Sequence, residues 1–430
     1  MTTDLDVVSA LAREAARIGG PDEVLTTEEV QAFIVESLAG ADLDGRSVCL
    51  VLPDATRSCP LPMLLSCVHG ALVGRVTSLT ALIALGTHAA MTEQELAHWL
   101  GYEEQGLEAT YPGLTVLQHE WWKPETFAAL GTSSAERVSE LTEGRLAVPA
   151  AVDLNRAVIE NDVAIVIGPV LPHEVVGMSG GNKYFFPGVA GQDIIDLTHW
   201  VGALITSAQI IGTRGITPVR ALINEASALI PSQKLALCIV PQAGSYELHA
   251  VTFGTTETAW AAAAEVTAET HVRYLDAPVK RVVSIIPEKY PEIWTAAKGC
   301  YKAQPAVADG GEVIIYAPHV TEVSETHHEI YDIGYHCIDY FTKQPERFAH
   351  VPKGVVAHST HVRGAGTYDT ATGVETNRIR VTLATGISRE VCEQVNLGYL
   401  DPASIDIDAW KADPEITVVE NAGEILFRLR

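Results

Sequence analysis

Short apolar, β-branched segments alternate with helix-like segments in the first 175 residues, and this alternation constrains the fold more than any other feature. The apolar segments are RSVCLVLPDATR, VTSLTALIALGTH, LTVLQHE and NDVAIVIGPVLPH. The helix-like segments between them include TEQELAHWLGYEE and SAERVSELTEG. Strands that alternate with helices are typical of a parallel sheet covered on both faces. The sequence therefore predicts an α/β fold.

Polar side chains follow each of these four predicted strands. They are Asp54, Thr56 and Arg57; Gly86, Thr87 and His88; His119 and Glu120; and His173. Ligands of parallel α/β sheets bind beyond the carboxyl ends of the strands. We therefore expect these side chains to share one site.

A second α/β pattern follows residue 275. VKRVVSIIP and GGEVIIYAPH are typical of strands, with the helix-like YPEIWTAAKGCYKAQPAV between them. A chain of 430 residues is also too long for one ordinary core. We predict two α/β domains with mainly parallel sheets and an interdomain active-site cleft. The domains would cover residues 1–272 and 275–405. Residues 408–430, which contain a predicted strand pair, would return to the first domain.

Charge and composition exclude several protein classes. The formal charge is 29 − 54 = −25, and so acidic a surface repels nucleic acid. The amino-terminal segment has no apolar signal core, and no run of 18 apolar residues occurs, so we expect a cytoplasmic protein that does not enter membranes. The seven cysteines form no CxxC pair, which argues against disulfides and a thiolate zinc site.

HEVVGMSGGNKYFFPG contains the most unusual group of chemically capable residues. The turn made by Ser179, Gly180, Gly181 and Asn182 would let backbone N–H groups approach a phosphate. It lacks the GxxxxGK[ST] and GxGxxG spacings, so an ordinary tight turn is the alternative. Lys183 directly follows this turn. Its alternative roles are a point charge beside a phosphate, an amine nucleophile and an ordinary surface lysine. The adjacent aromatic residues predict that Lys183 is partly buried.

Three histidines and one loop complete the candidate site. His88 and His173 are candidate general bases, and two bases facing each other suit inversion of a stereocentre. His199 is a lone candidate metal ligand, or else a structural histidine. Arg57 has the geometry to bind a carboxylate, with Asp54 orienting it or a substrate hydroxyl. A helix cap followed by an exposed arginine is the alternative for this loop.

This combination resembles the nickel-dependent lactate racemase family. The resemblance rests on DATR at 54–57, GTH at 86–88, and PHEVVGMSGGNKYFFPG at 172–188 with His199 downstream. It implies a nickel-pincer nucleotide (pyridinium-3,5-bisthiocarboxylic acid mononucleotide nickel) attached to Lys183, with His199 as the fourth nickel ligand. The first domain would thus bind the cofactor, with Thr87 and the glycine turn near its phosphate.

The resemblance also implies a reaction. A racemase or epimerase of this kind inverts C2 of a 2-hydroxy acid by reversible hydride transfer to the cofactor. His88 or His173 would take the hydroxyl proton, Arg57 would hold the substrate carboxylate with the support of Asp54, and Lys298 would be a further cation. The implied partners are a small-molecule 2-hydroxy acid and the cofactor-biosynthesis proteins that mature the enzyme.

VVAHSTHVRGAGTYD is the region expected to set the substrate. It offers His358, His361 and Arg363 in a predicted strand-to-loop transition, or in a polar surface loop. The resemblance implies that lactate-specific proteins have a more apolar pocket in this region. Because the residues here are polar, we expect a sugar acid or a dicarboxylate as the substrate rather than lactate. His327, His328 and His336 are a further histidine group for which we predict no second metal site.

Two alternatives stay open. One is another oxidoreductase or lyase on the same scaffold, although the GxGxxG fingerprint of a free dinucleotide is absent. The other is a non-catalytic protein that closes two domains over a phosphorylated ligand. That protein would need the glycine turn and Arg57, but not His88, His173 and Lys183 together.

Overall fold

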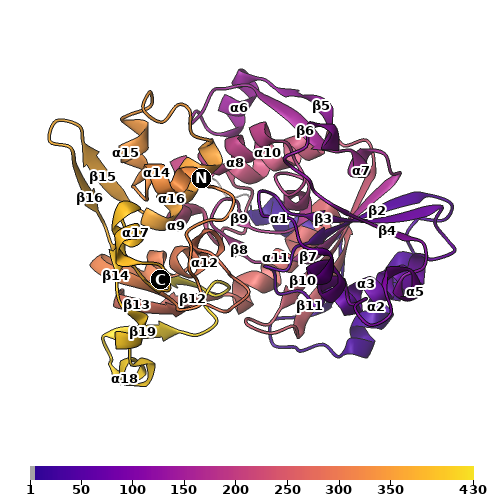
Figure 1. The fold of residues 1–430 in the computed structure, drawn as a ribbon. Coiled ribbons are helices and arrows are strands. Elements are labelled where there is room, and N and C mark those ends of the chain that lie inside the picture. The colour runs from indigo at the N-terminus through magenta and orange to yellow at the C-terminus, as the bar shows by residue number, and fades with distance from the viewer. Residues whose placement is uncertain (1–4) are drawn as a thin grey trace. The chain divides into compact units, whose positions relative to one another are not determined.

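The computed structural model describes residues 5–430, which divide into two compact units (Figure 1). Unit 1 comprises the chain up to Leu171, Met178–Ile195 and Arg214–Thr270. Unit 2 comprises Pro172–Gly177, Asp196–Thr213 and His271–Arg430. The chain passes between the units for the last time between Thr270 and His271, whereas the prediction placed the boundary near residue 272. The two earlier excursions differ from the prediction, because they place His173 and His199 in unit 2.

Unit 1 is built on a seven-stranded sheet in the order β1-β11-β10-β7-β2-β3-β4. The neighbours β10-β7, β7-β2, β2-β3 and β3-β4 are parallel, as predicted, while β11 runs antiparallel to β10 and β1. The strands are β1 Ala16–Gly19, β2 Ser47–Pro53, β3 Ser78–Ala84, β4 Leu114–Gln118, β7 Val163–Pro169, β10 Gln233–Pro241 and β11 Leu248–Thr255.

Helices of unit 1 begin at residues that cap them well. Thr26 and Thr92 each form a capping box, with Glu29 and Glu95 respectively, which satisfies free backbone N–H groups of the first turn. The main helices are α1 Leu5–Ala12, α2 Thr27–Ala39, α3 Leu61–Leu72, α4 Glu93–Leu100, α6 Ala135–Leu141, α10 Pro218–Ser227 and α11 Thr256–Thr270. A two-stranded antiparallel sheet, β5 Phe127–Ser133 with β6 Ala150–Asn155, lies outside the main sheet.

The central strands of unit 1 are apolar along their whole length because both faces are covered. Every residue of β7 is buried, and in β2 only Ser47 is partly accessible. Helices α2 and α3 add Ile34 and Leu65 to the same core. Continuous burial explains why these strands are uninterrupted apolar runs rather than alternating ones.

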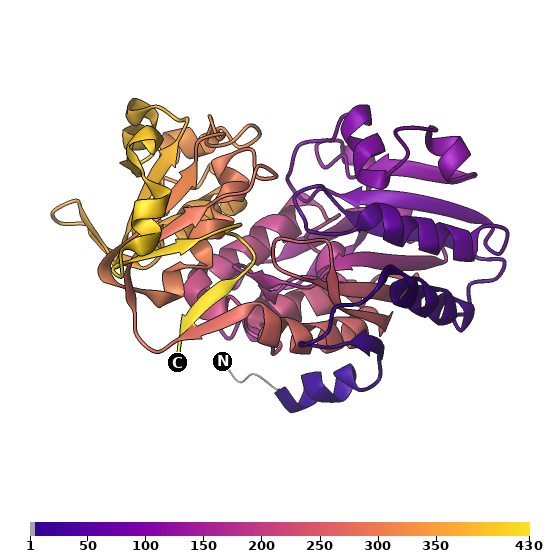
Figure 2. The same cartoon turned by 90° about the horizontal axis from the view of Figure 1, so that it is seen from below.

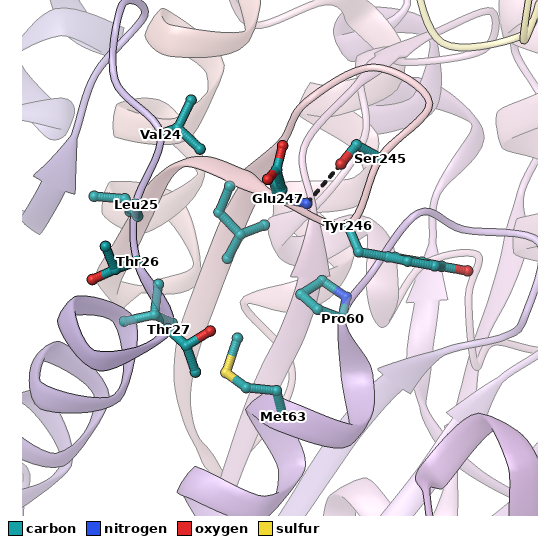
Figure 3. A pocket seen from close by; sticks show the side chains of 11 residues that line it. Val24, Leu25, Thr26, Thr27, Pro60, Met63, Ser245, Tyr246 and Glu247 are labelled. Carbon is teal, nitrogen blue, oxygen red and sulfur yellow. Dashed lines mark hydrogen bonds between the residues drawn. The ribbon is translucent and has the colours of Figure 1, made fainter.

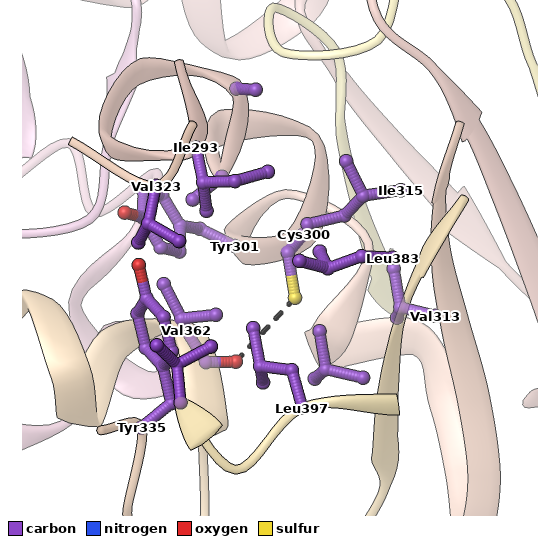
Figure 4. Packing of buried hydrophobic residues seen from close by; sticks show 14 of the residues in the cluster. Ile293, Cys300, Tyr301, Val313, Ile315, Val323, Tyr335, Val362, Leu383 and Leu397 are labelled. Carbon is purple, nitrogen blue, oxygen red and sulfur yellow. Dashed lines mark hydrogen bonds between the residues drawn. The ribbon is translucent and has the colours of Figure 1, made fainter. Parts of the chain in front are cut away.

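Unit 2 contains a five-stranded, fully parallel sheet in the order β18-β17-β14-β13-β19. Its strands are β13 Val279–Ile285, β14 Val307–Ala317, β17 Arg380–Thr385, β18 Gly398–Tyr399 and β19 Ile416–Val419. Figure 4 shows its core, where Ile315 and Leu383 from the sheet pack near Cys300, whose thiol donates to the Val362 carbonyl at 3.5 Å. The predicted βαβ pattern after residue 275 is therefore confirmed.

The carboxyl-terminal strands do not form the predicted pair. β19 pairs with β13, whereas β20 (Leu426–Leu429) pairs in parallel with β12 (Val272–Leu275), as seen from below in Figure 2. Both strands belong to unit 2 rather than to the first unit. The turn at Asn421 thus separates two strands of different sheets, and each of them pairs with a strand far away in sequence.

Helical segments of unit 2 also differ in detail from the prediction. The expected helix after Tyr290 is broken into α12 Ile293–Ala296, α13 Lys298–Tyr301 and the 3-10 turn Gln304–Ala306. The predicted strand-to-loop transition containing His358 is instead the helix α16, Lys353–Arg363. The β-branched residues of this segment favour a strand. The segment is nevertheless a helix, because its successive turns are buried in the core of unit 2.

Neither a membrane-spanning helix nor a disulfide is present among the described residues. Within residues 5–430, no helix combines the length and apolarity that crossing a membrane requires. All seven cysteines carry free thiols.

Candidate active site

Asp54 and His88 form a hydrogen-bonded pair at the carboxyl edge of the unit 1 sheet. Asp54 follows β2 directly, and His88 ends the turn after β3. His88 Nδ1 contacts Asp54 Oδ2, while Oδ1 accepts from the Thr56 hydroxyl at 2.6 Å and the Thr56 N–H at 3.1 Å. Because a carboxylate only accepts, it holds the proton of His88 on Nδ1 and leaves Nε2 as a free base.

The electrostatics of this pair favour the ionised carboxylate. Burial alone would raise the pKa of Asp54, but His88, Arg57 and the Thr56 hydroxyl together hold that pKa well below its usual range. Asp54 therefore supports His88, a contact that the sequence did not predict. Arg57 is half-buried and forms no ion pair within the described residues, so its guanidinium is available to an anion.

Lys183 lies on a short 3-10 turn, η2 Gly181–Tyr184, within unit 1. Its side chain is half-buried, in agreement with the prediction. The loop that carries Thr87 and His88 is tied to this segment, because the Gly86 N–H donates to the Gly188 carbonyl at 2.9 Å. The predicted cofactor-binding residue Thr87 is half-buried in the same loop. Lys183 and the Asp54–His88 pair thus belong to connected loops of one unit.

The glycine turn is closely packed against its own unit. A Cβ on Gly180 would lie 2.5 Å from Val170, and a Cβ on Gly181 would lie 2.7 Å from the Thr256 carbonyl. Ser179 Oγ accepts from the Leu171 N–H at 2.9 Å, and the buried Asn182 amide donates to Glu257 at 2.7 Å. Packing alone therefore requires these residue types, and phosphate binding by this turn stays a prediction.

Arg220 lies beneath the glycine turn and was missed at the sequence level. It is 1% exposed and donates to the carbonyls of Gly180, at 3.0 Å, and Met178. Its guanidinium stacks over Trp260, with 4.3 Å from Cζ to the ring centroid. Burial lowers its pKa to about 9. An arginine inside an amphipathic helix pattern gives no sign that it faces inward.

His173 occupies unit 2 and differs from His88 in its hydrogen bonding. Its Nδ1 accepts from the Val175 N–H at 3.1 Å and lies 3.6 Å from Glu174 Oε2. A neutral ring whose Nδ1 accepts carries its proton on Nε2. The two predicted bases therefore have opposite tautomers, with Nε2 as acceptor in His88 and as donor in His173.

His199, Lys298 and His361 gather with Glu174 in unit 2, and we call these four residues the unit 2 cluster. His199 is half-buried on α8 (Gln192–Ile205), and Lys298 is buried, with Nζ 4.6 Å from the Tyr290 ring centroid. Burial would raise the pKa of Glu174. Its backbone hydrogen bond and the charges of Lys302, His361 and Lys298 lower that pKa instead.

The three predicted substrate residues of α16 have different surroundings. His358 is bonded by two tyrosine hydroxyls, Tyr301 at 3.0 Å and Tyr335 at 3.3 Å. His361 is buried near His199 and Glu174. Arg363 donates to the Asn396 carbonyl at 3.2 Å, near the β15–β16 hairpin (Gly366–Asp369 and Val374–Asn377).

The remaining predicted histidines have other partners. His119 is fully buried, with its Nδ1 3.2 Å from the Asn155 amide, and does not join His88. His336 pairs with Glu375 at 2.6 Å, whereas His327 stacks on Trp294 at 4.0 Å. Within residues 5–430, no three His, Cys, Asp or Glu side chains are grouped to hold a metal ion.

A surface pocket of about 700 Å³ opens elsewhere on unit 1 (Figure 3). Met63, Pro60 and Leu25 form much of its apolar lining, with Tyr246 and Glu247 from the loop between β10 and β11. None of the predicted site residues lines it. The candidate site therefore rests on the chemically capable side chains and not on this pocket.

Comparison with known protein families identifies one whose model matches part of this chain. Residues 34–211 match the family model described as the lactate racemase N-terminal domain. This match covers the Asp54–His88 pair, Lys183 and His199. Residues 34–211 therefore belong to the lactate racemase family as its N-terminal domain.

Solved structures share the fold of this chain. A Thermotoga maritima protein is 32% identical, with a TM-score of 0.87 over 96% of this chain and 100% of the other. The lactate racemase apoprotein from Thermoanaerobacterium thermosaccharolyticum is 18% identical, with a TM-score of 0.65 over 99% of this chain and 93% of the other. The latter likeness shows the fold alone. A search of curated proteins found no match.

Proposed function

We propose that this protein is a racemase or epimerase that inverts C2 of a 2-hydroxy acid by reversible hydride transfer, with a nickel-pincer nucleotide attached to Lys183. The observation that carries the proposal is the buried Asp54 carboxylate on His88, in a loop tied to the Lys183 segment. A carboxylate that fixes one imidazole tautomer prepares the ring to take a proton. A simple ligand-binding protein has no need of such a pair.

The residues present fit the cofactor that the family resemblance implies. Lys183 offers an amine on a half-buried turn, and His199 offers one half-buried imidazole. A cofactor that brings three donors of its own requires one further ligand, so a single histidine suffices. When bound, this cofactor would supply a pyridinium ring that accepts a hydride from C2 and returns it.

The two histidines would have different roles at the substrate oxygen. His88, with its free Nε2, would take the hydroxyl proton of one stereoisomer. His173, with its proton on Nε2, would donate a hydrogen bond to the oxygen of the 2-oxo acid, because giving up that proton would leave an imidazolate. The protonated His88 would return the same proton to the oxygen when the hydride returns to C2, so the protons balance within one turnover.

Cations would bind and orient the substrate. Arg57 has no ion pair within the described residues, and we assign it the substrate carboxylate. Lys298 would add a second positive charge that holds the 2-oxo acid until the hydride returns. A sugar acid and a dicarboxylate with a hydroxyl at C2, the two kinds of substrate expected from the sequence, are both 2-hydroxy acids.

Lys183→Ala tests the proposal. We expect protein made together with the cofactor pathway to carry a nucleotide-sized mass adduct on the peptide containing Lys183, with about one nickel per chain. Lys183→Ala should lose the adduct because no amine is left to form the covalent bond. Intact mass, peptide mapping and metal analysis measure both results.

Lys234, which donates to the Ser227 carbonyl at 2.7 Å, provides the matched control. Lys234→Ala should keep the adduct and the nickel. An unmodified Lys183 in protein from a host with a working pathway would overturn the proposal, and a phosphate-ligand binding protein would then be the better description.

A further inference from the structure

His361 is a buried histidine with neither ring nitrogen satisfied. Its side chain is 3% exposed, and both Nδ1 and Nε2 lack a hydrogen-bond partner within the described residues. Buried polar atoms in native proteins are nearly always paired, and each exception calls for an explanation such as a ligand, an ordered water or a catalytic role. The two unpaired ring nitrogens of His361 therefore indicate a binding site for a ligand group.

His358, one turn earlier on α16, shows what a structural histidine looks like in this unit. Both of its ring nitrogens are bonded, one by Tyr301 and the other by Tyr335. The helix thus satisfies one histidine completely and leaves the other unpaired. The contrast separates two residues that the sequence analysis treated alike.

The surroundings of His361 are charged rather than apolar. Glu174 and His199 both act electrostatically on it, and Tyr301 packs edge-on with its ring centroid 6.2 Å away. Glu174 in turn is influenced by Lys298 and Lys302. His361 is therefore part of the cluster that contains the proposed nickel ligand and a proposed substrate cation, all within unit 2.

The unpaired atoms specify the chemistry of the missing group. A neutral imidazole presents one donor and one acceptor, so a group that both donates and accepts suits it best. A hydroxyl does both, whereas a carboxylate only accepts and would be repelled by the half-buried Glu174. An alkyl chain satisfies neither nitrogen.

We propose that His361 and Glu174 form a subsite for a further hydroxyl of the substrate, beyond the one at C2. This inference rests on the proposed function and narrows it. The substrate would be a polyhydroxylated 2-hydroxy acid, and neither lactate nor a dicarboxylate. Arg363, whose guanidinium faces the β15–β16 hairpin region, takes no part.

Three acids of four carbons test the subsite: trihydroxybutanoate, 2-hydroxybutanoate and malate. The cofactor-loaded enzyme should invert trihydroxybutanoate with a kcat/KM at least about tenfold above that of the other two. In His361→Leu, trihydroxybutanoate should lose at least about tenfold more kcat/KM than 2-hydroxybutanoate. His361→Gln, which keeps a donor and an acceptor, should retain part of the preference.

The melting temperature is a second measurement, and it distinguishes the proposed subsite from a purely structural role of His361. Since His361 has no bonds to lose, His361→Leu should not lower the melting temperature of the unliganded protein. Tyr335→Phe, which removes only a bond to His358, should leave the substrate preference unchanged and is the matched control. Glu174→Gln should raise the relative rate with malate, because the repelling charge is gone.

The outcomes distinguish the two proposals. Inversion of 2-hydroxybutanoate or malate as readily as trihydroxybutanoate would overturn the subsite while leaving the proposed function intact. Equal losses for all three acids in His361→Leu, with a lowered melting temperature, would do the same. If the loaded enzyme exchanges C2 of none of them, the proposed function fails and the subsite with it.

Discussion

At the scale of single residues, hydrogen bonds to Nδ1 distinguish the two candidate bases. Asp54 fixes the proton of His88 on Nδ1, and the Val175 N–H leaves the proton of His173 on Nε2. The sequence placed a histidine after each of two strands but could not say which nitrogen each would present. That choice depends on partners the chain supplies only after folding.

Asp54→Asn tests the role of the carboxylate. An amide that donates to Nδ1 would move the proton of His88 to Nε2, so the ring would no longer be a base. We expect kcat for C2 inversion to fall by about a hundredfold or more, the usual scale of general base catalysis. Steady-state kinetics from pH 5 to 9 check this, since the variant should also change the pH profile.

Asp162→Asn is the matched control, because Asp162 also accepts from a neighbouring backbone N–H and hydroxyl, those of Ser47, but far from any candidate residue. It should leave kcat unchanged. A kcat for Asp54→Asn within twofold of the wild type would remove the pair from the mechanism.

At the scale of elements, the glycine turn and helix α10 form one packed assembly. Arg220 donates to two carbonyls of the turn, and Asn182 bonds to Glu257 and Asn224. A buried arginine fork of this kind holds backbone in place at a fixed distance. The position of Lys183, directly after the turn, follows from that assembly.

Gly181→Ala measures how tightly the turn is held. Gly181 has φ +57°, and an added Cβ would lie 2.7 Å from the Thr256 carbonyl and 2.8 Å from Trp260 Cβ. We expect the free energy of unfolding to fall by about 3 kcal/mol, the sum of left-handed strain and overpacking. Urea denaturation of the unloaded protein checks the value.

Gly45→Ala separates the two causes. Gly45 also has positive φ, at +73°, but nothing lies within 4 Å of its Cβ position. Its substitution should cost about 1 kcal/mol, from backbone strain alone. Similar losses at both glycines would show that the turn at Gly181 can relax.

At the scale of the whole molecule, buried neutral histidines make stability depend on pH. Burial lowers the pKa of both His119 and His361 to about 4. In the unfolded chain a histidine binds its proton near pH 6.5. Between these values the unfolded state holds more protons than the folded state, so stability is lost as pH falls from about 6.5 to about 4.

His119→Gln tests this dependence in unit 1. The wild type should lose about 2 kcal/mol more than the variant between pH 7 and pH 5, because the variant has one proton fewer to bind on unfolding. Urea titrations at the two pH values give the comparison. A His119→Gln variant with the same pH dependence as the wild type would show that His119 is charged in the fold.

The sequence by itself determined the parallel strands, their polar carboxyl ends and the motif around Lys183. Apolar runs and turn residues are local signals, and the covered sheet follows directly from them. Half-burial of Lys183 was equally local, because its aromatic neighbours had to pack somewhere.

Only the tertiary structure decided which residues meet. His173 and His199 belong to unit 2, because the chain makes two excursions into that unit, one before and one after the Lys183 segment. α16 is a helix rather than a strand end, and it pairs His358 with two tyrosines while leaving His361 unpaired. These contacts join residues far apart in the chain, and local residue patterns carry no information about such partners.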